Sequence, residues 1–191
     1  MILPIVKFGD PMLRTKGKAI EKITPEIKRL INDMFDTMHD AAGVGLAAQQ
    51  VGQALQLTII DVRAVKDRPS TMEIAGKPVD VAAHMPLVLI NPKVIPFGNP
   101  AKGPEGCLSF PEIYTDITRP ESVEVEAINA EGNPIRFKAG GLLSRAVQHE
   151  VDHLNAILFI DRMTAEAKAE VKDEIDALQA ETKEALKKQK K

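Results

Sequence analysis

Hydrophobic positions recur with two different periods along the chain, and the changes of period divide it into predicted helices and strands. The first helical stretch follows Thr24-Pro25, with apolar residues at Ile27, Leu30, Ile31, Met34, Met38 and Ala41. This spacing places them on one face of a helix. Thr24 is a typical N-cap residue, and proline is favoured at the first helical position. Because glycine often ends helices, we expect this one to stop at Gly43.

Several segments have the composition or the alternation of β-strands. Some are rich in β-branched and aliphatic residues, and others alternate apolar with charged residues, as half-exposed strands do. They are 57–62, 87–90, 122–128, 135–138 and 157–160. We expect Asn91-Pro92 to close the second of these strands. Glu131-Gly132-Asn133-Pro134 is a turn sequence, so the strands on either side of it predict a hairpin.

Other stretches lack a clear period. Residues 63–85 contain turn sequences at 66–70 and 76–78, which indicates turns or a mobile loop. The stretch 96–111 is rich in proline, so we expect irregular or edge-like structure there. Gly140-Gly141 breaks the preceding strand, and the pattern predicts helices over 142–154 and from Thr164 onward.

Together these elements predict an α+β fold. Antiparallel β-sheets would pack around a central helix at 142–154, and a further helix would end the chain. With 191 residues, no internal repeat and no linker, we expect a single domain over 1–191. Residues 164–191 would form its C-terminal helix and basic tail.

Composition restricts the possible partners and the compartment. The formal net charge is −2, so no global basic field indicates DNA or an anionic membrane as a partner. The start of the chain lacks the features of a signal peptide, and no run is long enough to span a bilayer. Cys107 is the only cysteine, which excludes an intrachain disulfide and fits a reducing compartment. We therefore expect a cytoplasmic protein.

The strongest chemical signal is Gln148-His149-Glu150-Val151-Asp152-His153-Leu154. Four residues turn a helix by about 400°, so His149 and His153 lie one above the other on one face. Two imidazoles at this spacing can bind one metal ion, and Glu150 is close enough to reach a metal-bound water. Two histidines in a helix are also common without any metal, so the rest of the chain must decide.

A catalytic site of the zinc type needs three protein ligands and one open position. Cys107 is the natural third ligand, because a thiolate binds metal strongly. A lone cysteine is otherwise usually a small buried hydrophobic residue. The neighbours of Cys107, in Glu105-Gly106-Cys107-Leu108-Ser109, favour the ligand interpretation.

A third motif, Gly43-Val44-Gly45-Leu46-Ala47-Ala48-Gln49-Gln50, has small residues that allow close approach of a backbone or a substrate. It lacks the third glycine and the Lys-Ser/Thr of nucleotide-binding loops. The segments 43–50, 105–109 and 148–154 are the three motifs of the peptide deformylase family, in the same order. The chain resembles that family over nearly its whole length. It departs from the family at Ala156, where a glycine is usual.

The resemblance implies an enzyme that removes the formyl group from N-formylmethionyl nascent peptides. It implies one Fe²⁺ per chain, replaceable by Zn²⁺, Ni²⁺ or Co²⁺, and its ligands would be Cys107, His149 and His153. Glu150 would be the general acid and base in the attack of a metal-bound water. The Gln50 amide and the backbone N–H of Leu108 would stabilise the oxyanion.

The resemblance also implies where the substrate binds. Val44, Leu142 and Ala146 would form the apolar pocket for methionine, and Arg145 would lie near its mouth. Residues 43–46 and the segment before Glu105 would pair with the peptide backbone as added strands. The implied substrate-binding residues are Gly43, Val44, Gly45, Leu46, Glu105, Leu142 and Ala146.

Residues outside the motifs have weaker assignments. Asp152 and Arg119 are candidates to support the metal ligands. His39 is expected to be a partly exposed helix residue rather than a ligand, and His84 to be structural. The C-terminal helix carries an apolar stripe at Val171, Ile175, Leu178 and Leu186. Four of the final five residues are lysines, so a contact of this tail with ribosomal RNA is a hypothesis.

Two alternatives belong to other functional classes. A thermolysin-like metallopeptidase would take its third ligand from an acid such as Glu170 or Glu174. A non-catalytic metal- or peptide-binding module of the same fold would need neither Glu150 nor Gln50, and both are present. Metal binding that survives substitution of Cys107 would favour the metallopeptidase.

Overall fold

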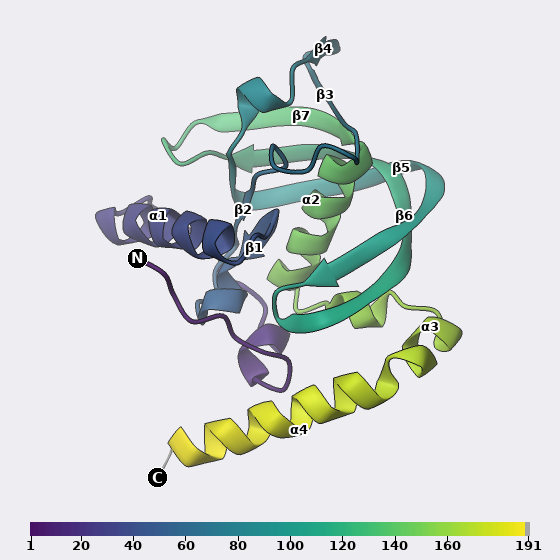
Figure 1. The fold of residues 1–191 in the computed structure, drawn as a ribbon. Helices are drawn as coiled ribbons and strands as arrows, with labels where there is room; N and C mark the ends of the chain where they lie inside the picture. Colours follow the sequence, from purple (N-terminus) through teal and green to yellow (C-terminus); the bar gives the residue numbers. More distant parts are fainter. Residues whose placement is uncertain (190–191) are drawn as a thin grey trace.

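Helix α2 (Gly141–Leu154) lies at the centre of the molecule, and the rest of the chain surrounds it (Figure 1). The computed structural model describes residues 1–189. Strands β1 and β2 lie on one side of α2, and the long strands β5 and β6 curve around the other. Strands and helices thus enclose the predicted metal-binding helix, and the α+β fold with antiparallel pairing and C-terminal helices is confirmed.

One antiparallel sheet of seven strands has the order β1-β2-β5-β6-β7-β3-β4. The strand bounds are β1 Gly45–Ala47, β2 Leu57–Ile60, β3 Ser70–Ile74, β4 Lys77–Val79, β5 Leu87–Cys107, β6 Phe110–Ile128 and β7 Pro134–Gly140. The hairpin predicted around 131–134 is present, since β6 pairs with β7 from Ile128↔Pro134 to Ser122↔Gly140. Strand β2 pairs with β5 only over Leu87–Ile90, so most of β5 pairs with β6 alone.

Helix α1 (Pro25–Asp40) begins as the sequence predicts. The side chain of Thr24 accepts a hydrogen bond from the backbone N–H of Ile27 at 3.4 Å. Ile31, Met34 and Met38 of the predicted stripe are buried in a hydrophobic cluster with β2. The helix ends at Asp40, before the expected stop, because the chain turns at Ala41 and Ala42.

The region 63–85 is more ordered than its sequence pattern indicates. It contains β3 and β4, which form a hairpin closed by Ala75 and Gly76, both with positive φ angles. A two-residue turn of this kind matches the twist of the flanking strands. Strand β3 also pairs with β7, and Met72 is buried in the core. Lys77-Pro78 belongs to β4 rather than to the turn, because an edge strand tolerates proline.

The expectation that Asn91-Pro92 closes a strand is wrong. The register between β5 and β6 shifts between Ile90 and Lys93, so the strand passes this dipeptide through an irregularity and continues to Cys107. The proline-rich stretch 96–111 is therefore mostly strand rather than irregular. Its edge-like character is confirmed, since within residues 1–189 no strand pairs with β5 on the other side beyond Ile90.

The expected strand at 157–160 is also wrong. Residues Phe159–Asp161 form a 3₁₀ turn, and the backbone N–H of Leu158 donates to the Asp161 carboxylate at 2.9 Å. The apolar side chains of Leu158, Phe159 and Ile160 are buried in a cluster with Leu13. Their hydrophobicity reflects this burial and not strand pairing.

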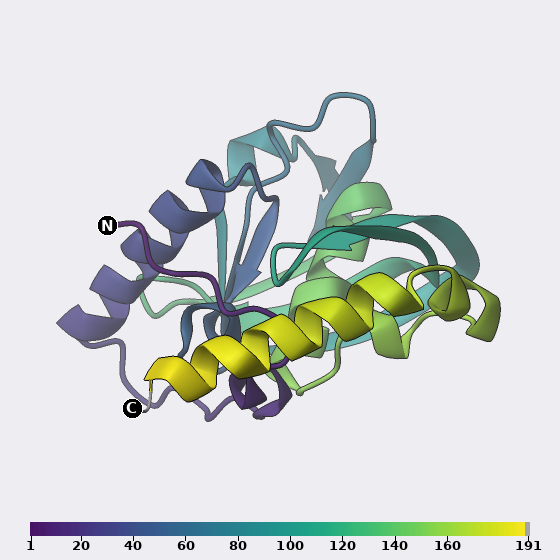
Figure 2. The ribbon, with the colours of Figure 1, turned by 60° about the horizontal axis from the view of Figure 1, so that its bottom comes forward.

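The C-terminal helix predicted from Thr164 consists of two segments, α3 (Ala165–Glu170) and α4 (Lys172–Gln189). Thr164 is the N-cap of α3, and Ile175 of the predicted stripe is buried. Helix α4 crosses over the N-terminal segment (Figure 2), and Gly9 lies close against Gln179. Lys190 and Lys191 of the predicted basic tail lie outside the described residues.

Among residues 1–189, no helix combines the length and the apolar character that crossing a bilayer requires.

Candidate metal centre and its cavity

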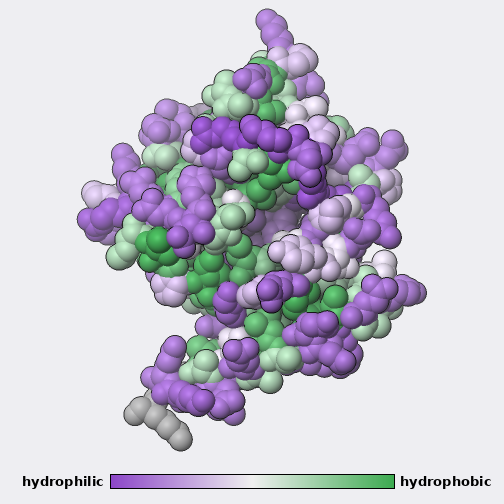
Figure 3. Space-filling view, viewed as in Figure 1, coloured by the Kyte–Doolittle hydropathy of each residue, from purple (hydrophilic) through white to green (hydrophobic). Residues whose placement is uncertain are grey.

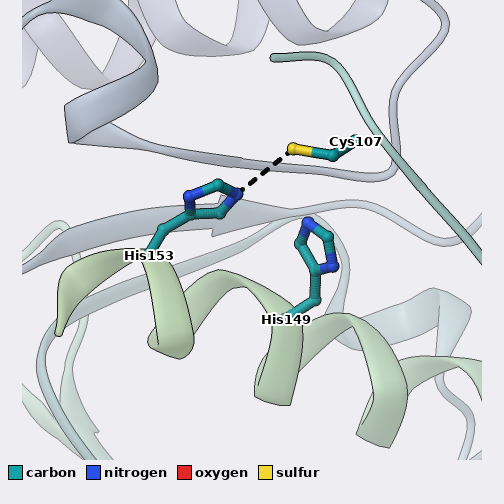
Figure 4. A group of neighbouring side chains, drawn as sticks. All are labelled: Cys107, His149 and His153. Atoms are coloured by element: carbon teal, nitrogen blue, oxygen red, sulfur yellow. Dashed lines mark hydrogen bonds between the residues drawn. The ribbon is translucent and has the colours of Figure 1, made fainter. Parts of the chain in front are cut away.

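The three predicted metal ligands lie together. One donor atom from each of Cys107, His149 and His153 lies within 4.8 Å of the other two. The histidines project from one face of α2 toward the cysteine, which is the last residue of β5 (Figure 4). The Cys107 Sγ is 3.3 Å from Nε2 of His153. The fold therefore brings the two histidines of α2 together with Cys107, which lies 42 residues before His149 in the chain.

Glu105 fixes the orientation of His149. Its Oε2 is 2.9 Å from Nδ1 of His149, which leaves Nε2 of that ring for the ligand cluster. A carboxylate in this position keeps the hydrogen on Nδ1 and makes Nε2 the better donor to a metal. The family resemblance implied a substrate-binding role for Glu105. The structure instead places its carboxylate behind a metal ligand, although the residue also lines the cavity.

Two arginines hold the Glu105 carboxylate. Arg119 binds it with two nitrogens, at 2.5 and 3.0 Å, and binds Asp152 with the third at 2.8 Å. Arg145 reaches the same carboxylate at 3.0 Å and also donates to the carbonyl oxygens of Ile117 and Ala101. Arg119 and Asp152, which the sequence indicated as supporting groups, thus form a buried ion pair behind the metal centre. Asp152 does not contact a histidine itself.

These contacts affect the acidity of the groups in the centre. Burial acts to raise the pKa of Glu105, but the bonds to His149 and Arg119 outweigh it and hold that pKa well below its ordinary value. Burial lowers the pKa of His153, so its imidazole stays neutral and able to bind metal. Glu105 is therefore a permanent anion, which balances the arginines around it.

Glu150 lies against β1. A Cβ atom on Gly45 would lie 2.5 Å from Oε1 of Glu150, so only glycine leaves room for the carboxylate. Burial raises the pKa of Glu150 to about 7. Its Oε2 is buried and has no hydrogen-bond partner among the described residues. A carboxyl group with this pKa can both accept and release a proton near neutral pH.

Gln50 points its amide group at the metal centre. The amide Oε1 accepts a hydrogen bond from the backbone of Ala47 at 2.9 Å, which fixes the direction of the NH₂ group. The Nε2 then lies 3.2 Å from the Ser109 hydroxyl and 3.6 Å from the Cys107 sulfur. Ser109 belongs to the predicted motif, but no local pattern around it indicates that its hydroxyl lies against Gln50.

A cavity of about 500 Å³ opens beside the centre. The face in Figure 3 is hollowed near its centre, where hydrophobic and polar residues meet. Of the predicted site residues, the cavity is lined by Gly43, Val44, Gly45, Gln50, Glu105, Cys107, Leu108, Leu142, Arg145, Ala146, His149 and Glu150. Leu46 and His153 are the exceptions. The Leu46 side chain is fully buried in the cluster beneath α1, and His153 is buried with 1% of its surface exposed.

The alternative third ligands are not in the centre. Glu170 and Glu174 are exposed residues of α3 and α4, and within residues 1–189 the ligand cluster consists of Cys107, His149 and His153. A thiolate with two imidazoles suits a divalent transition metal, and three protein ligands leave a coordination position open. The residues present therefore fit a catalytic metal ion.

Comparisons with known proteins agree with this geometry. A family model described as "Polypeptide deformylase" matches residues 2–169. The chain is 47% identical over 178 residues to a peptide deformylase of Methylacidiphilum infernorum, and the match covers 93% of each protein. A peptide deformylase from Legionella pneumophila superposes with a TM-score of 0.79 and 34% identity, covering 94% of this chain and 96% of that one. A peptide deformylase from Synechococcus elongatus in complex with actinonin gives a TM-score of 0.75 and 38% identity, covering 94% and 85%.

Proposed function

The chain belongs to the polypeptide deformylase family of metal-dependent hydrolases, and we propose that its metal centre removes the formyl group from N-formylmethionyl peptides. One observation carries the proposal. Cys107, His149 and His153 place three donor atoms within 4.8 Å of one another, beside a cavity that Cys107, His149 and Glu150 line. The metallopeptidase alternative needs an acidic third ligand, and no such acid lies in the ligand cluster of residues 1–189. A non-catalytic module would not need Glu150, which lies in the cavity lining.

Cys107, His149 and His153 would hold one Fe²⁺ per chain. A bound metal ion polarises the formyl carbonyl as a Lewis acid and makes a water more acidic. The mixed thiolate and imidazole donors also accommodate Zn²⁺, Ni²⁺ and Co²⁺. Ferrous iron is the ion that the family resemblance implies, and Glu105 supports any of them by orienting His149.

Glu150 moves the proton. Its carboxylate accepts a proton from the attacking water and passes it to the leaving amino nitrogen of methionine. A pKa of about 7 suits both transfers, since neither protonation state is strongly favoured near neutral pH.

Gln50 and Leu108 would stabilise the oxyanion. The Gln50 NH₂ group is already aimed at the centre by its bond from Ala47, so little reorganisation is needed when negative charge develops. The backbone N–H of Leu108 follows directly after the Cys107 ligand, and Leu108 lines the cavity.

The methionine side chain would enter between Val44, Leu142 and Ala146, which line the cavity with apolar groups. Strand β1 is the edge of the sheet, so its free side can pair with an extended peptide. Leu46 would contribute backbone only. This pairing explains how many nascent chains with different sequences can be accepted.

Two further assignments concern the whole chain. Residues 1–191 would act as one catalytic domain. The protein would be located in the cytoplasm, because nascent formylated chains are made there. The lysines at the end of the tail, including Lys187 and Lys188 in α4, would contact ribosomal RNA. Deleting residues 187–191 should lower ribosome affinity and its dependence on salt, with activity on a short peptide unchanged.

The decisive experiment measures hydrolysis of formyl-Met-Ala-Ser by anaerobically purified protein, with metal analysis on the same sample. We expect turnover with one metal per chain, and inhibition by actinonin. Cys107→Ala should lose most of the metal, whereas Glu150→Gln should keep it and lose about 10²- to 10⁴-fold in rate. No turnover by metal-loaded protein would refute the function, and full metal content in Cys107→Ala would refute the ligand set.

A further inference from the structure

Two cations at the active-site cavity differ from the others in their surroundings. Within residues 1–189, Lys7 is the single lysine that is not exposed. Among the arginines, only Arg68, Arg119 and Arg145 are not exposed, and the last two are paired with Glu105. Lys7 and Arg68 are half-buried, both line the cavity, and neither has an acidic partner within 4.0 Å among the described residues. Since burial strips a cation of part of its hydration, an anion that reaches it is held more strongly than at an exposed lysine.

Lys7 is held beside the oxyanion side of the cavity. Its neighbours in the chain are both hydrogen-bonded to residues of that side. The backbone N–H of Val6 donates to the Gln50 carbonyl at 2.8 Å, and that of Phe8 donates to the Ser109 carbonyl at 2.9 Å. Phe8 also stacks on Phe110, with ring centroids 4.8 Å apart. The segment that carries Lys7 is therefore fixed relative to Gln50.

Arg68 is held beside the methionine side of the cavity. The carbonyl of the next residue, Pro69, accepts a hydrogen bond from the backbone N–H of Leu142 at 3.0 Å. The hydroxyl of Ser70 accepts from the N–H of Leu143 at 3.0 Å, so the loop is tied to the start of α2. Arg68 also lines a second cavity of about 280 Å³, which shares Pro104, Leu142 and Arg145 with the first.

The acids of the cavity do not neutralise these cations. Glu105 is bound by two arginines and His149, and Glu150 is buried at the metal centre. The remaining acid of the lining is Glu112, which is exposed. Two half-buried cations and one solvated carboxylate thus line the cavity outside the metal centre.

From these contacts we propose that Lys7 and Arg68 bind carboxylates in the peptide just beyond formylmethionine, so that substrates with aspartate or glutamate at positions two to four are preferred. The inference rests on the proposed deformylase activity. An extended peptide advances by about 3.3 Å per residue and turns successive side chains to opposite sides. Side chains beyond the methionine therefore reach cations that lie on two different parts of the wall. The terminal carboxylate of a short peptide offers the same chemistry.

The test compares kcat/KM for C-terminally amidated formyl-Met-Asp-Glu-Ala, formyl-Met-Asn-Gln-Ala and formyl-Met-Lys-Lys-Ala. Amidation removes the terminal carboxylate, and the free acid of the neutral peptide measures that contribution separately. We expect kcat/KM for the acidic peptide to be about fourfold to tenfold higher than for the neutral peptide, and this ratio to decrease as salt is added.

Variants assign the effect to residues. Lys7→Gln and Arg68→Gln should each reduce the acidic-to-neutral ratio by about twofold to fivefold, while kcat/KM for the neutral peptide stays within about twofold. Glu112→Gln should raise the ratio. Lys66→Gln and Lys16→Gln remove exposed lysines that do not line the cavity, and should leave the ratio unchanged.

Binding separates this proposal from the activity itself. Calorimetry with the products Met-Asp-Glu-Ala-amide and Met-Asn-Gln-Ala-amide reports the charge preference without turnover. Equal affinities, or a ratio that Lys7→Gln and Arg68→Gln leave unchanged, would overturn the proposal even if deformylation is efficient. Absence of turnover with a preserved binding preference would refute the activity instead and leave the anion-binding residues assigned.

Discussion

Gly45 and Glu150 are packed so closely that a Cβ atom on the glycine would lie 2.5 Å from Oε1 of the glutamate. Neither partner can easily move. Gly45 is paired with Ile60 of β2, and Glu150 is in the buried middle of α2. The strand therefore acts as a wall that keeps the Glu150 carboxylate at the metal centre.

Gly45→Ala should consequently displace the carboxylate while leaving Cys107, His149 and His153 in place. We expect the metal content to stay near that of the wild type and kcat to fall by about 10²-fold, toward the loss expected without general acid–base catalysis. Steady-state kinetics and metal analysis on one sample measure both. Gly52→Ala is the matched control, because a Cβ there meets no atom within 4 Å and costs only the strain of its φ of +80°. Wild-type turnover in Gly45→Ala would mean that the wall does not position Glu150.

Arg119 should matter far more than Arg162, although both bind Asp152. Arg119 is buried between Glu105 and Asp152, so Arg119→Gln removes the buried cation that these two carboxylates share. We expect a loss of about 3–5 kcal/mol in the free energy of unfolding and about tenfold to 100-fold weaker metal binding. Arg162 is 45% exposed in its side chain, so Arg162→Gln should cost under about 1 kcal/mol.

Urea unfolding and competition with a chelator distinguish these two effects. Equal losses in both variants would contradict the assignment of Arg119 as the central support of Glu105. Unchanged metal affinity in a folded Arg119→Gln protein would show that Glu105 orients His149 without help from the arginine.

How far the sequence could predict this site depends on the kind of contact. The four-residue spacing of His149 and His153 fixes their common face once the segment is helical, so local geometry was enough. The position of Cys107 followed from its motif and not from any local rule. The partnership of Glu105 with His149 joins residues 44 positions apart, and only the fold brings them together.

The errors in the fold have a similar cause. Pro96 and its neighbours argue against a strand locally, yet β5 pairs with β6 along most of its length. Among the described residues no strand pairs with the other side of β5 beyond Ile90, so the missing N–H groups of the prolines are tolerated there. Leu158 to Ile160 had a strand-like composition because they are buried, and burial does not specify an extended backbone. Leu46 belongs to a motif that lines the cavity, but alternation along β1 turns its side chain into the core.

The pair Arg14–Asp161 should make stability depend on pH in the acid range. Burial acts to raise the pKa of Asp161, but hydrogen bonds from Arg14 and the backbone of Leu158 outweigh it and hold that pKa below 3.8. A lowered native pKa stabilises the fold above the unfolded pKa, and that stabilisation disappears as the pH falls through the native value. Both side chains are more than a third exposed, so we expect Arg14→Gln to cost only about 0.5 kcal/mol at pH 7.

The measurement is urea unfolding of both proteins at pH 7, 5, 4 and 3. The difference between wild type and Arg14→Gln should be constant from pH 7 to 5 and shrink below pH 4. A difference that grows toward low pH would reverse the sign and show that Asp161 is not held ionised by Arg14.

Helix α4 should contribute to stability through one side chain in particular. Ile175 is 6% exposed and packs in the cluster that contains Leu13 and Phe110, whereas Leu186 is only partly buried and lies outside that cluster. Ile175→Ala leaves a cavity and should cost about 2–4 kcal/mol. For a chain of this size, that loss corresponds to a Tm lower by roughly 5–15 °C. Leu186→Ala is the matched control in the same helix and should change Tm by less than about 4 °C.

Cys107 packs against the same cluster, so Tm should be measured with and without bound metal. Metal binding stabilises the native state, so the metal-free protein shows the loss caused by Ile175→Ala without that added stabilisation. If Ile175→Ala left Tm unchanged, α4 would not be part of the cooperative fold, and its packing over the N-terminal segment would have to be explained by a role other than stability.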